Sequence, residues 1–259
     1  MVDAGRRHLL NPEVCVVMTA YNAASTIKVA VESVLGQSFE DFHLIVLDDG
    51  STDDTASTVS TITDPRLTFI AAEHHGRSAA LNAAIAASTA RYIALNDADD
   101  QSLPDRLSLQ VDYLQSHPEV EVVGGSMHAI EGSRQWTLSY PTDHQDIRAE
   151  LDAGKMPIAN ACVMFSRDWF ERTGGFATEL DRLEDFELYF RQRSQTRFAA
   201  VPQTILTYTF RTFSRQQWQA EENQRLTIAG SSGQASGLGY LKYRLAVWSQ
   251  QRGLGLTRR

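Results

Sequence analysis

An apolar run passes without a break into a cluster of acids in the segment Tyr92-Ile93-Ala94-Leu95-Asn96-Asp97-Ala98-Asp99-Asp100. A short, continuous apolar run is typical of a strand that is covered on both faces. In open α/β sheets, ligands bind beyond the carboxyl ends of the strands. In an α/β fold, these acids would therefore lie at the ligand-binding edge.

Two runs upstream have the same character. Residues 14–18 are continuously apolar, and residues 42–47 run directly into Asp48-Asp49-Gly50-Ser51. Between the two runs, residues 27–35 carry a helical stripe of apolar side chains, and Ser25 is the expected N-cap of that helix. Strands that alternate with helical patterns in this way predict an α/β sheet that is mostly parallel.

The second half of the chain is less regular. After Pro104 we expect a helix, then a strand over residues 120–123 that ends at Gly124-Gly125, and then a polar loop over residues 131–145. The remaining expected elements are strands and helices at residues 147–151, 161–165, 183–191, 204–210, 216–228 and 240–251. A Gly/Ser-rich joint at residues 230–239 separates the last two of these, which are both helices.

Charge is distributed unevenly along the 259 residues, whose net charge is −8. Residues 1–190 hold 30 acids and 13 bases, a net charge of −17, whereas residues 191–259 hold 2 acids and 11 bases, a net charge of +9. Such asymmetry favours a phosphate-bearing partner or a membrane surface, and packing of the basic tail on its own acidic body is an equal alternative. The hydrophobic content of 42% excludes a disordered or fibrous protein.

The sequence shows no sign of a membrane span or of a secretory leader. No apolar stretch approaches the roughly 20 residues that cross a bilayer, and residues 1–13 lack the apolar core of a signal peptide. Cys15 and Cys162 are too few for a metal site or a disulfide framework. We therefore expect a cytoplasmic protein, with peripheral contact at the inner face of the membrane as an open option.

Asp97 and Asp99 have the most informative spacing among the acids. In an extended segment, residues i and i+2 project to the same side, and one or two carboxylates with substrate phosphates commonly hold Mg²⁺ or Mn²⁺. The alternative is a solvated acidic turn. Asp49, which follows the predicted strand at residues 42–47, could accept a hydrogen bond from a ribose or a base, or else cap a strand-to-helix turn.

The end of the first strand excludes other nucleotide-binding folds. That strand ends in Met18-Thr19-Ala20-Tyr21-Asn22 and has no Gly-rich phosphate loop, so there is neither a dinucleotide fingerprint nor a P-loop. The sequence also lacks the Gly-x-Ser-x-Gly elbow that would indicate a serine hydrolase. Recognition of a base would then use side chains such as Thr19, Tyr21 and Asp49, and a metal would neutralise a diphosphate.

Five motifs, in the correct order over about residues 13–212, resemble those of the family-2 glycosyltransferases. They lie at residues 16–22, 33–39, 48–53 and 92–100, and at residues 174–176 with 184–188. The resemblance implies a GT-A fold, which is a Rossmann-like, mostly parallel sheet with helices on both faces. It also implies a nucleotide-sugar donor, a divalent cation and inversion at the anomeric carbon.

The resemblance also implies domain boundaries. The GT-A domain would occupy residues 11–215, divided into a nucleotide-sugar half over residues 11–102 and an acceptor half over residues 103–215. A basic helical C-terminal extension would occupy residues 216–259. The extension could contact a membrane or form a homodimer.

Five residues receive a donor-binding role from the resemblance. Thr19, Tyr21 and Asp49 would surround the nucleoside, with Tyr21 stacked on the base and Asp49 accepting the N–H of the base. Arg77 would lie near the base or the diphosphate. Asp97 would face the ribose or the sugar.

Three further acids receive roles in metal binding and catalysis. Asp99 would bind Mg²⁺ or Mn²⁺, and Asp185 would be the catalytic base with Glu184 beside it. Like-charge repulsion from Glu184 and Glu187 would raise the pKa of Asp185, although acids are also favoured at the start of a helix without any catalytic role. Many family members carry a Tyr-Arg-x-His pattern near the end of this fold, and Phe213 stands here in the place of His.

The sequence therefore predicts an inverting glycosyltransferase of the hexosyltransferase type. It would move a sugar from a nucleotide-diphosphate sugar, with UDP as the expected nucleotide, to a saccharide or lipid-linked acceptor in the biosynthesis of envelope polysaccharide. Nucleic acid is not an expected partner. A retaining transferase on the same fold and a non-catalytic nucleotide-sugar-binding protein are the alternatives.

Overall fold

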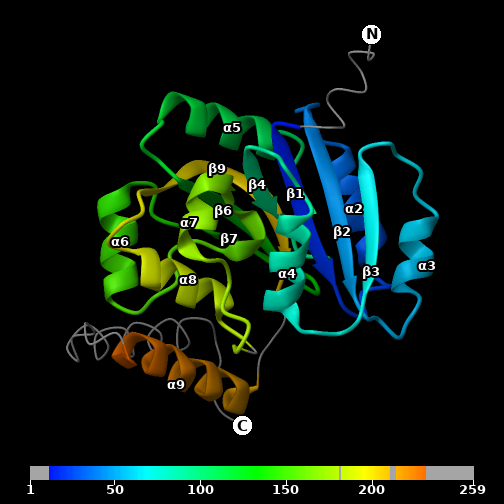
Figure 1. The fold of residues 1–259 in the computed structure, drawn as a ribbon. Coiled ribbons are helices and arrows are strands. Elements are labelled where there is room, and N and C mark those ends of the chain that lie inside the picture. Colours follow the sequence, from blue (N-terminus) through cyan, green and yellow to red (C-terminus); the bar gives the residue numbers. More distant parts are fainter. Residues whose placement is uncertain (1–11, 181, 211–213, 232–259) are drawn as a thin grey trace.

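The computed structural model describes residues 12–180, 182–210 and 214–231, and Figure 1 shows their arrangement. Within these residues, nine strands form one sheet. They are β1 (Val14–Ala20), β2 (Phe42–Asp49), β3 (Leu67–Ala72), β4 (Tyr92–Leu95), β5 (Gln101–Ser102), β6 (Val122–Glu131), β7 (Arg134–Leu138), β8 (Met164–Ser166) and β9 (Phe198–Thr209). Their order across the sheet is β3-β2-β1-β4-β8-β6-β9-β5, and β7 pairs with β6.

Helices cover both faces of this sheet. One face carries α2 (Ile27–Leu35), α3 (Thr55–Ser60) and α5 (Arg106–Ser116). The other carries α4 (Arg77–Ala86), α6 (His144–Asp152), α7 (Arg167–Thr173) and α8 (Glu184–Gln192). A 3-10 turn, η1 (Asn160–Cys162), precedes β8, and α9 (Arg215–Ser231) lies below α8 in Figure 1. Within these bounds, no helix is both long enough and apolar enough to span a bilayer.

The composition of β1 follows from its place between two helical layers. All seven of its residues are buried. Val14, Val16 and Met18 belong to the core beneath α2, whereas Cys15 and Val17 belong to the core beneath α4. Because successive strand residues point to opposite faces, a strand that is covered on both sides must be apolar at every position.

The parallel pairing predicted from the sequence is present in the first half of the chain, and the second half makes the sheet mixed. β1 is parallel to β2 and β4, and β2 is parallel to β3. β8 is antiparallel to both β4 and β6, and β6 is parallel to β9. The carboxyl ends of β1, β2, β4, β6 and β9 therefore all lie at one edge of the sheet.

The prediction that a strand ends at Gly124-Gly125 is wrong, because β6 continues through both glycines. A Cβ at Gly124 would lie 2.8 Å from Ile158 Cγ2, and a Cβ at Gly125 would lie 2.5 Å from Ile205 Cδ1. Both glycines are needed for close packing inside a buried strand, and neither marks a turn.

The polar loop predicted over residues 131–145 contains β7, which forms a hairpin with β6. Gly132, at φ +58°, lies in the turn of this hairpin, where glycine meets no steric penalty. In β7, the partly buried Trp136 and Leu138 alternate with exposed neighbours. Two apolar residues are too weak a period-2 signal to show a strand in the sequence.

Several smaller differences concern where elements begin and end. Thr26, one residue after Ser25, is the N-cap of α2 and makes no side-chain capping hydrogen bond. The strand predicted over residues 161–165 is divided between η1 and the short β8. The predicted helix over residues 216–228 is present as α9, whereas Phe213, the predicted helix over residues 240–251 and most of the Gly/Ser-rich joint lie outside the described residues.

We expect Gly125→Ala to destabilise the protein, because the added methyl group would overlap the side chain of Ile205. Overpacking of a buried site costs about 1–3 kcal/mol, which urea unfolding should report as a lower free energy of unfolding. The matched double variant Gly125→Ala/Ile205→Val removes Cδ1 and should recover part of the loss. An unchanged free energy of unfolding in the single variant would contradict this packing role.

Candidate active site

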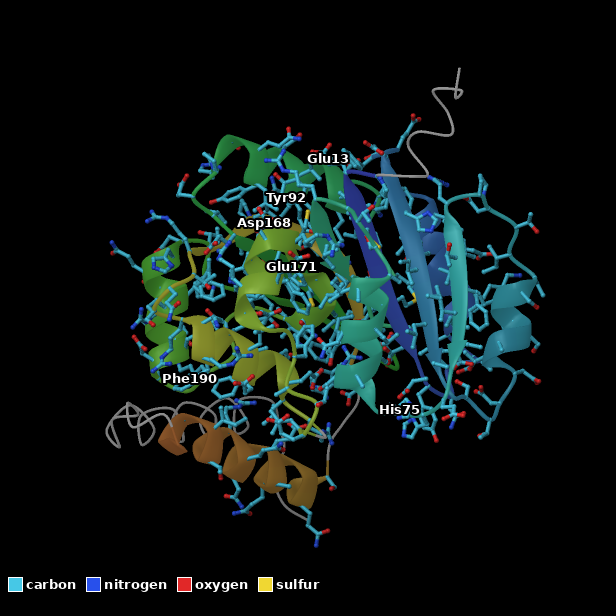
Figure 2. The ribbon with its side chains drawn as sticks, in the orientation of Figure 1. Glu13, His75, Tyr92, Asp168, Glu171 and Phe190 are labelled. Carbon is cyan, nitrogen blue, oxygen red and sulfur yellow. The ribbon has the colours of Figure 1, made fainter. Side chains whose placement is uncertain are left out.

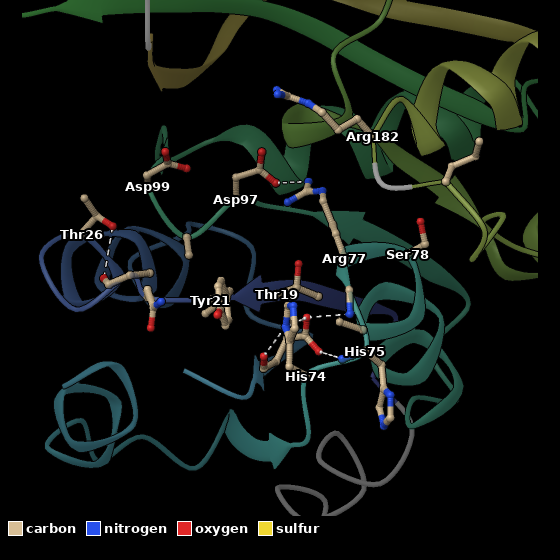
Figure 3. A pocket seen from close by; sticks show the side chains of 18 of the residues that line it. Thr19, Tyr21, Thr26, His74, His75, Arg77, Ser78, Asp97, Asp99 and Arg182 are labelled. Atoms are coloured by element: carbon tan, nitrogen blue, oxygen red, sulfur yellow. Dashed lines mark hydrogen bonds and ion pairs between the residues drawn. The ribbon is translucent and has the colours of Figure 1, made fainter. Parts of the chain in front are cut away.

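A cavity of about 610 Å³ opens at the carboxyl edge of the sheet (Figure 3). Its walls come from the ends of β1, β2 and β9, the loops after β1, β3 and β4, the start of α4 and the loop before α8. They include six residues to which the sequence analysis gave a ligand-binding role, namely Thr19, Tyr21, Asp49, Arg77, Asp97 and Asp99. The fold therefore brings together side chains from three separate motifs, and Arg77 joins them from the start of α4.

Arg77 connects this cavity to the acids of α8. Its Nη2 lies 2.5 Å from Asp97 Oδ1, and its Nε donates to Glu184 Oε1 at 2.8 Å. The negative charge of Asp97, and then that of Glu184, raises the pKa of Arg77 above its ordinary value. Burial of the guanidinium opposes this rise but is outweighed. One guanidinium thus joins the acidic loop after β4 to the first residue of α8, next to Asp185.

The acidic loop after β4 has the geometry of a cation site. Oxygen atoms of Asp97, Asp99 and Asp100 lie within 4.8 Å of one another. Asp100 is fully buried; its Oδ1 accepts the N–H of Thr209 at 2.8 Å, and its Oδ2 has no hydrogen-bond partner. Burial first, and then repulsion from Asp97, raises the pKa of Asp100 to about 8. Since a buried oxygen without a partner is costly, the three carboxyl groups fit a hard divalent cation.

Asp100 and two residues that support the acidic loop do not stand out as functional residues in the sequence. Arg106, only 1% exposed, donates to the last carbonyl of β4 at 2.6 Å and to the side-chain oxygens of Asn96 and Ser102 at 3.0 Å. Thr209 Oγ1 donates to the carbonyl of Asp99 at 2.5 Å. No local sequence signal indicates that an arginine in the first turn of a helix is buried behind an acidic loop.

Asp49 lines the cavity, but protein groups already surround its carboxylate. Oδ1 accepts the N–H of His75 at 2.8 Å, and Oδ2 accepts the N–H of Gly76 at 3.0 Å and lies 2.9 Å from His74 Nδ1. The observed contacts therefore fix the loop that leads into α4 and Arg77. A hydrogen bond from a nucleotide base to Asp49 stays a prediction.

Tyr21 and His74 form an aromatic wall of the cavity. Their rings stack with centroids 4.4 Å apart, and Tyr21 is 50% exposed. Figure 3 shows this pair beside Thr19, which is buried. An exposed, flat aromatic surface of this kind is suited to stacking, and the predicted contact of Tyr21 with a base stays a prediction.

The polar residues after β2 hold the loop after β1 in place. The N–H of Asn22 donates to Ser51 Oγ at 2.8 Å, and Asn22 Oδ1 accepts the N–H of Thr52 at 2.8 Å. The N–H of Ala23 donates to Thr55 Oγ1 at 2.8 Å. Ser51, Thr52 and Thr55 therefore hold the loop after β2 against the loop after β1. Within the loop after β1, Asn22 has a positive φ of 52°.

Asp185 lies in the first turn of α8, next to Glu184, which accepts a hydrogen bond from Arg77. Its Oδ1 accepts the N–H of Phe186 at 2.7 Å. Burial first, and then repulsion from Glu184, raises the pKa of Asp185 to about 7. Glu187, which the sequence analysis expected to add to this repulsion, forms an ion pair with Arg191 at 2.7 Å instead.

Helix α9 packs on the body of the protein close to the cavity. Arg182, which lines the cavity, has Nη2 at 2.7 Å from Glu221 Oε1 of α9. Phe190, labelled in Figure 2, packs with Phe186 and Ala229 between α8 and α9. For its described part, the C-terminal extension thus contacts its own chain.

The fold is that of the GT-A class. The sequence model of glycosyl transferase family 2 matches residues 15–174, which is more than half of the chain. The chain belongs to glycosyl transferase family 2.

Three comparisons illustrate the likeness. EpsE of Bacillus subtilis, which is named as a glycosyltransferase, is 31% identical over 188 residues, or 70% of this chain and 66% of EpsE. The β-1,3-glucosyltransferase WfaP of Escherichia coli is 35% identical over 104 residues, or 40% of this chain and 41% of WfaP. The mannosyltransferase PcManGT of Pyrobaculum calidifontis has a similar fold, with a TM-score of 0.65 and 23% identity over 88% of this chain and 65% of PcManGT. The chain thus spans about two thirds or less of these proteins.

Proposed function

We propose that this chain is an inverting glycosyltransferase that moves a sugar from a UDP-sugar to the hydroxyl of a saccharide or lipid-linked acceptor, assisted by Mg²⁺ or Mn²⁺. The observation that carries the proposal is the pair of contacts made by Arg77, with Asp97 at 2.5 Å and with Glu184 at 2.8 Å. Through this one side chain, the carboxylates suited to a cation are joined to Glu184, and its neighbour in the chain, Asp185, is suited to act as a base.

Asp97, Asp99 and Asp100 would hold the cation. The buried, unpartnered Oδ2 of Asp100 is an oxygen that such a ligand would satisfy. When bound, the cation supplies a Lewis acid that stabilises the negative charge of the departing nucleoside diphosphate. Arg77 would add a second positive charge beside Asp97.

Asp185 would remove the proton from the acceptor hydroxyl as that oxygen attacks the anomeric carbon. A single displacement inverts the configuration, so the base must lie on the face opposite the leaving group. A pKa of about 7 keeps much of Asp185 ionised at neutral pH while making it a stronger base than an ordinary carboxylate. Glu184 would support this role by keeping the pKa of Asp185 high.

Thr19, Tyr21 and Asp49 would surround the nucleoside, and uracil is the proposed base. WfaP is named for the use of UDP-glucose, which supports this choice. The PcManGT structure contains GDP-mannose and Mn²⁺, so guanine is the base against which uracil must be tested.

We further assign donor binding to residues 11–102, acceptor binding to residues 103–215 and a supporting role to the basic extension over residues 216–259. The extension would aid peripheral contact with the cytoplasmic face of a membrane or self-association. WfaP is named for a diphosphoundecaprenol-linked acceptor, which supports a place near a membrane.

Thermal unfolding in the presence of nucleotides tests the donor assignment. With Mg²⁺ or Mn²⁺, UDP at about 100 times its Kd should raise Tm by about 5–10 °C, because a ligand that binds only the folded state stabilises it by mass action. ADP is the control and should change Tm little. An equal shift with GDP would contradict the uracil preference, and the absence of a shift with every nucleotide would overturn the proposed function. The configuration of the transferred sugar then separates inversion from retention.

A further inference from the structure

We propose that Trp136, Tyr208 and Phe210 form an acceptor subsite on which a saccharide ring stacks. The inference rests on the proposed function and adds the place and the chemistry of acceptor recognition. These three side chains are called the aromatic platform below.

The aromatic platform is one continuous surface on the β7-β6-β9 part of the sheet. Trp136 and Tyr208 both pair in register with Ala129 of β6, so their side chains lie on the same face. Phe210 meets both rings edge-on, with its centroid 5.1 Å from that of Trp136 and 6.2 Å from that of Tyr208. All three side chains are partly exposed.

The aromatic platform continues directly from the cavity proposed to bind the donor. Tyr208 lines that cavity together with Asp99 and Thr209. β9, which carries Tyr208, ends at the same edge of the sheet as β4, which leads into the acidic loop. A molecule bound to the platform would therefore lie beside the sugar of a bound donor.

The chemistry of the surface fits a saccharide better than an apolar partner. The C–H face of a pyranose ring stacks on aromatic rings, while its hydroxyls need hydrogen-bonding groups at the rim. Arg134 and Glu131 provide such a rim, with Arg134 Nη1 at 3.1 Å from Glu131 Oε2. The Arg134 guanidinium lies 5.8 Å from the Trp136 ring centroid.

NMR of the tryptophan indole N–H groups in the full chain tests this inference. With UDP and Mg²⁺ bound, cellotetraose or chitotetraose is added up to about 10 mM, which fills about nine tenths of a site with a Kd of about 1 mM. The Trp136 signal, identified by its loss in Trp136→Phe, should shift with saccharide. Trp169 is an internal control, because it is 1% exposed and its Nε1 donates to Thr196 Oγ1 at 2.6 Å.

Variants then test whether stacking supplies the affinity. Trp136→Ala should weaken saccharide binding by about fivefold or more, as expected for a truncated aromatic contact at a binding site, and Trp136→Phe should retain most of it. Tyr113→Ala, which removes a partly exposed ring from α5, is the matched control and should leave saccharide affinity unchanged.

Each other outcome has a definite meaning. If UDP binds and the Trp136 signal does not respond to either saccharide, the aromatic platform is not an acceptor subsite, although the proposed donor function stands. If no nucleotide binds, the proposed function itself fails. If the signal responds only to vesicles of anionic phospholipid, the surface contacts a membrane and the inference is wrong.

Discussion

Asp185→Asn should lower the rate of sugar transfer by about 10²- to 10⁴-fold, which is the usual contribution of a general base. The amide has the shape of the carboxyl group but cannot accept the proton of the acceptor hydroxyl. The fold should survive, because an uncharged group suits a site that already raises the pKa of Asp185 to about 7. UDP affinity, measured by calorimetry, should stay close to that of the unaltered protein.

The pH dependence gives this prediction a second readout. Because the ionised form of Asp185 is the active base, the rate of the unaltered protein should rise as the pH increases through about 7. The residual rate of Asp185→Asn should lose that step.

Glu187→Gln is the matched control, since Glu187 lies in the same turn of α8 but pairs with Arg191. An exposed pair of this kind contributes little to stability, and transfer should be nearly unaffected. Transfer that persists in Asp185→Asn at close to the normal rate would show that Asp185 is not the base.

Removal of the cation should produce the second large effect. We expect EDTA to weaken UDP binding by tenfold or more, on the order of 1.4 kcal/mol or above, because the diphosphate would lose its counter-charge. Asp99→Asn should weaken Mn²⁺ binding to a similar extent, as measured by the electron paramagnetic resonance signal of free Mn²⁺. Both measurements are independent of turnover.

Asp105→Asn is the control for Asp99→Asn. Asp105 precedes α5, is exposed and makes no capping hydrogen bond, and it is not among the residues that line the cavity. Mn²⁺ affinity should be unchanged in this variant. UDP binding that is insensitive to EDTA would contradict a role for Asp99 in holding a metal.

The sequence was most informative where each local pattern had one physical meaning. The continuous apolar run at residues 14–18 is typical of a doubly covered strand, and it is β1. Gly124-Gly125 was misleading because glycine marks both turns and close packing, and only Ile158 and Ile205 show which applies. Those two side chains are far away in the sequence, so no local pattern contains this information.

The candidate site shows the same difference between what a local pattern contains and what depends on residues distant in the sequence. The motifs predicted a shared site for Thr19, Tyr21, Asp97 and Asp99, and all four residues line one cavity. The sequence could not show that the carboxylate of Asp49 is already bound by backbone N–H groups, because that depends on the path of the loop before α4.

The burial of Arg106 behind the acidic loop could not be predicted from the local sequence. This burial depends on the way α5 packs against β4.

The hydrogen bonds that join Asn22 and Ala23 to residues 51–55 have a thermodynamic consequence. Fixing a free backbone residue costs roughly 1–2 kcal/mol in conformational entropy at the moment it is ordered. Here that cost is met when the protein folds, because the two loops brace each other before any ligand arrives. Binding of a nucleoside would then require little additional ordering of this wall, and more of its intrinsic contact energy would appear as affinity.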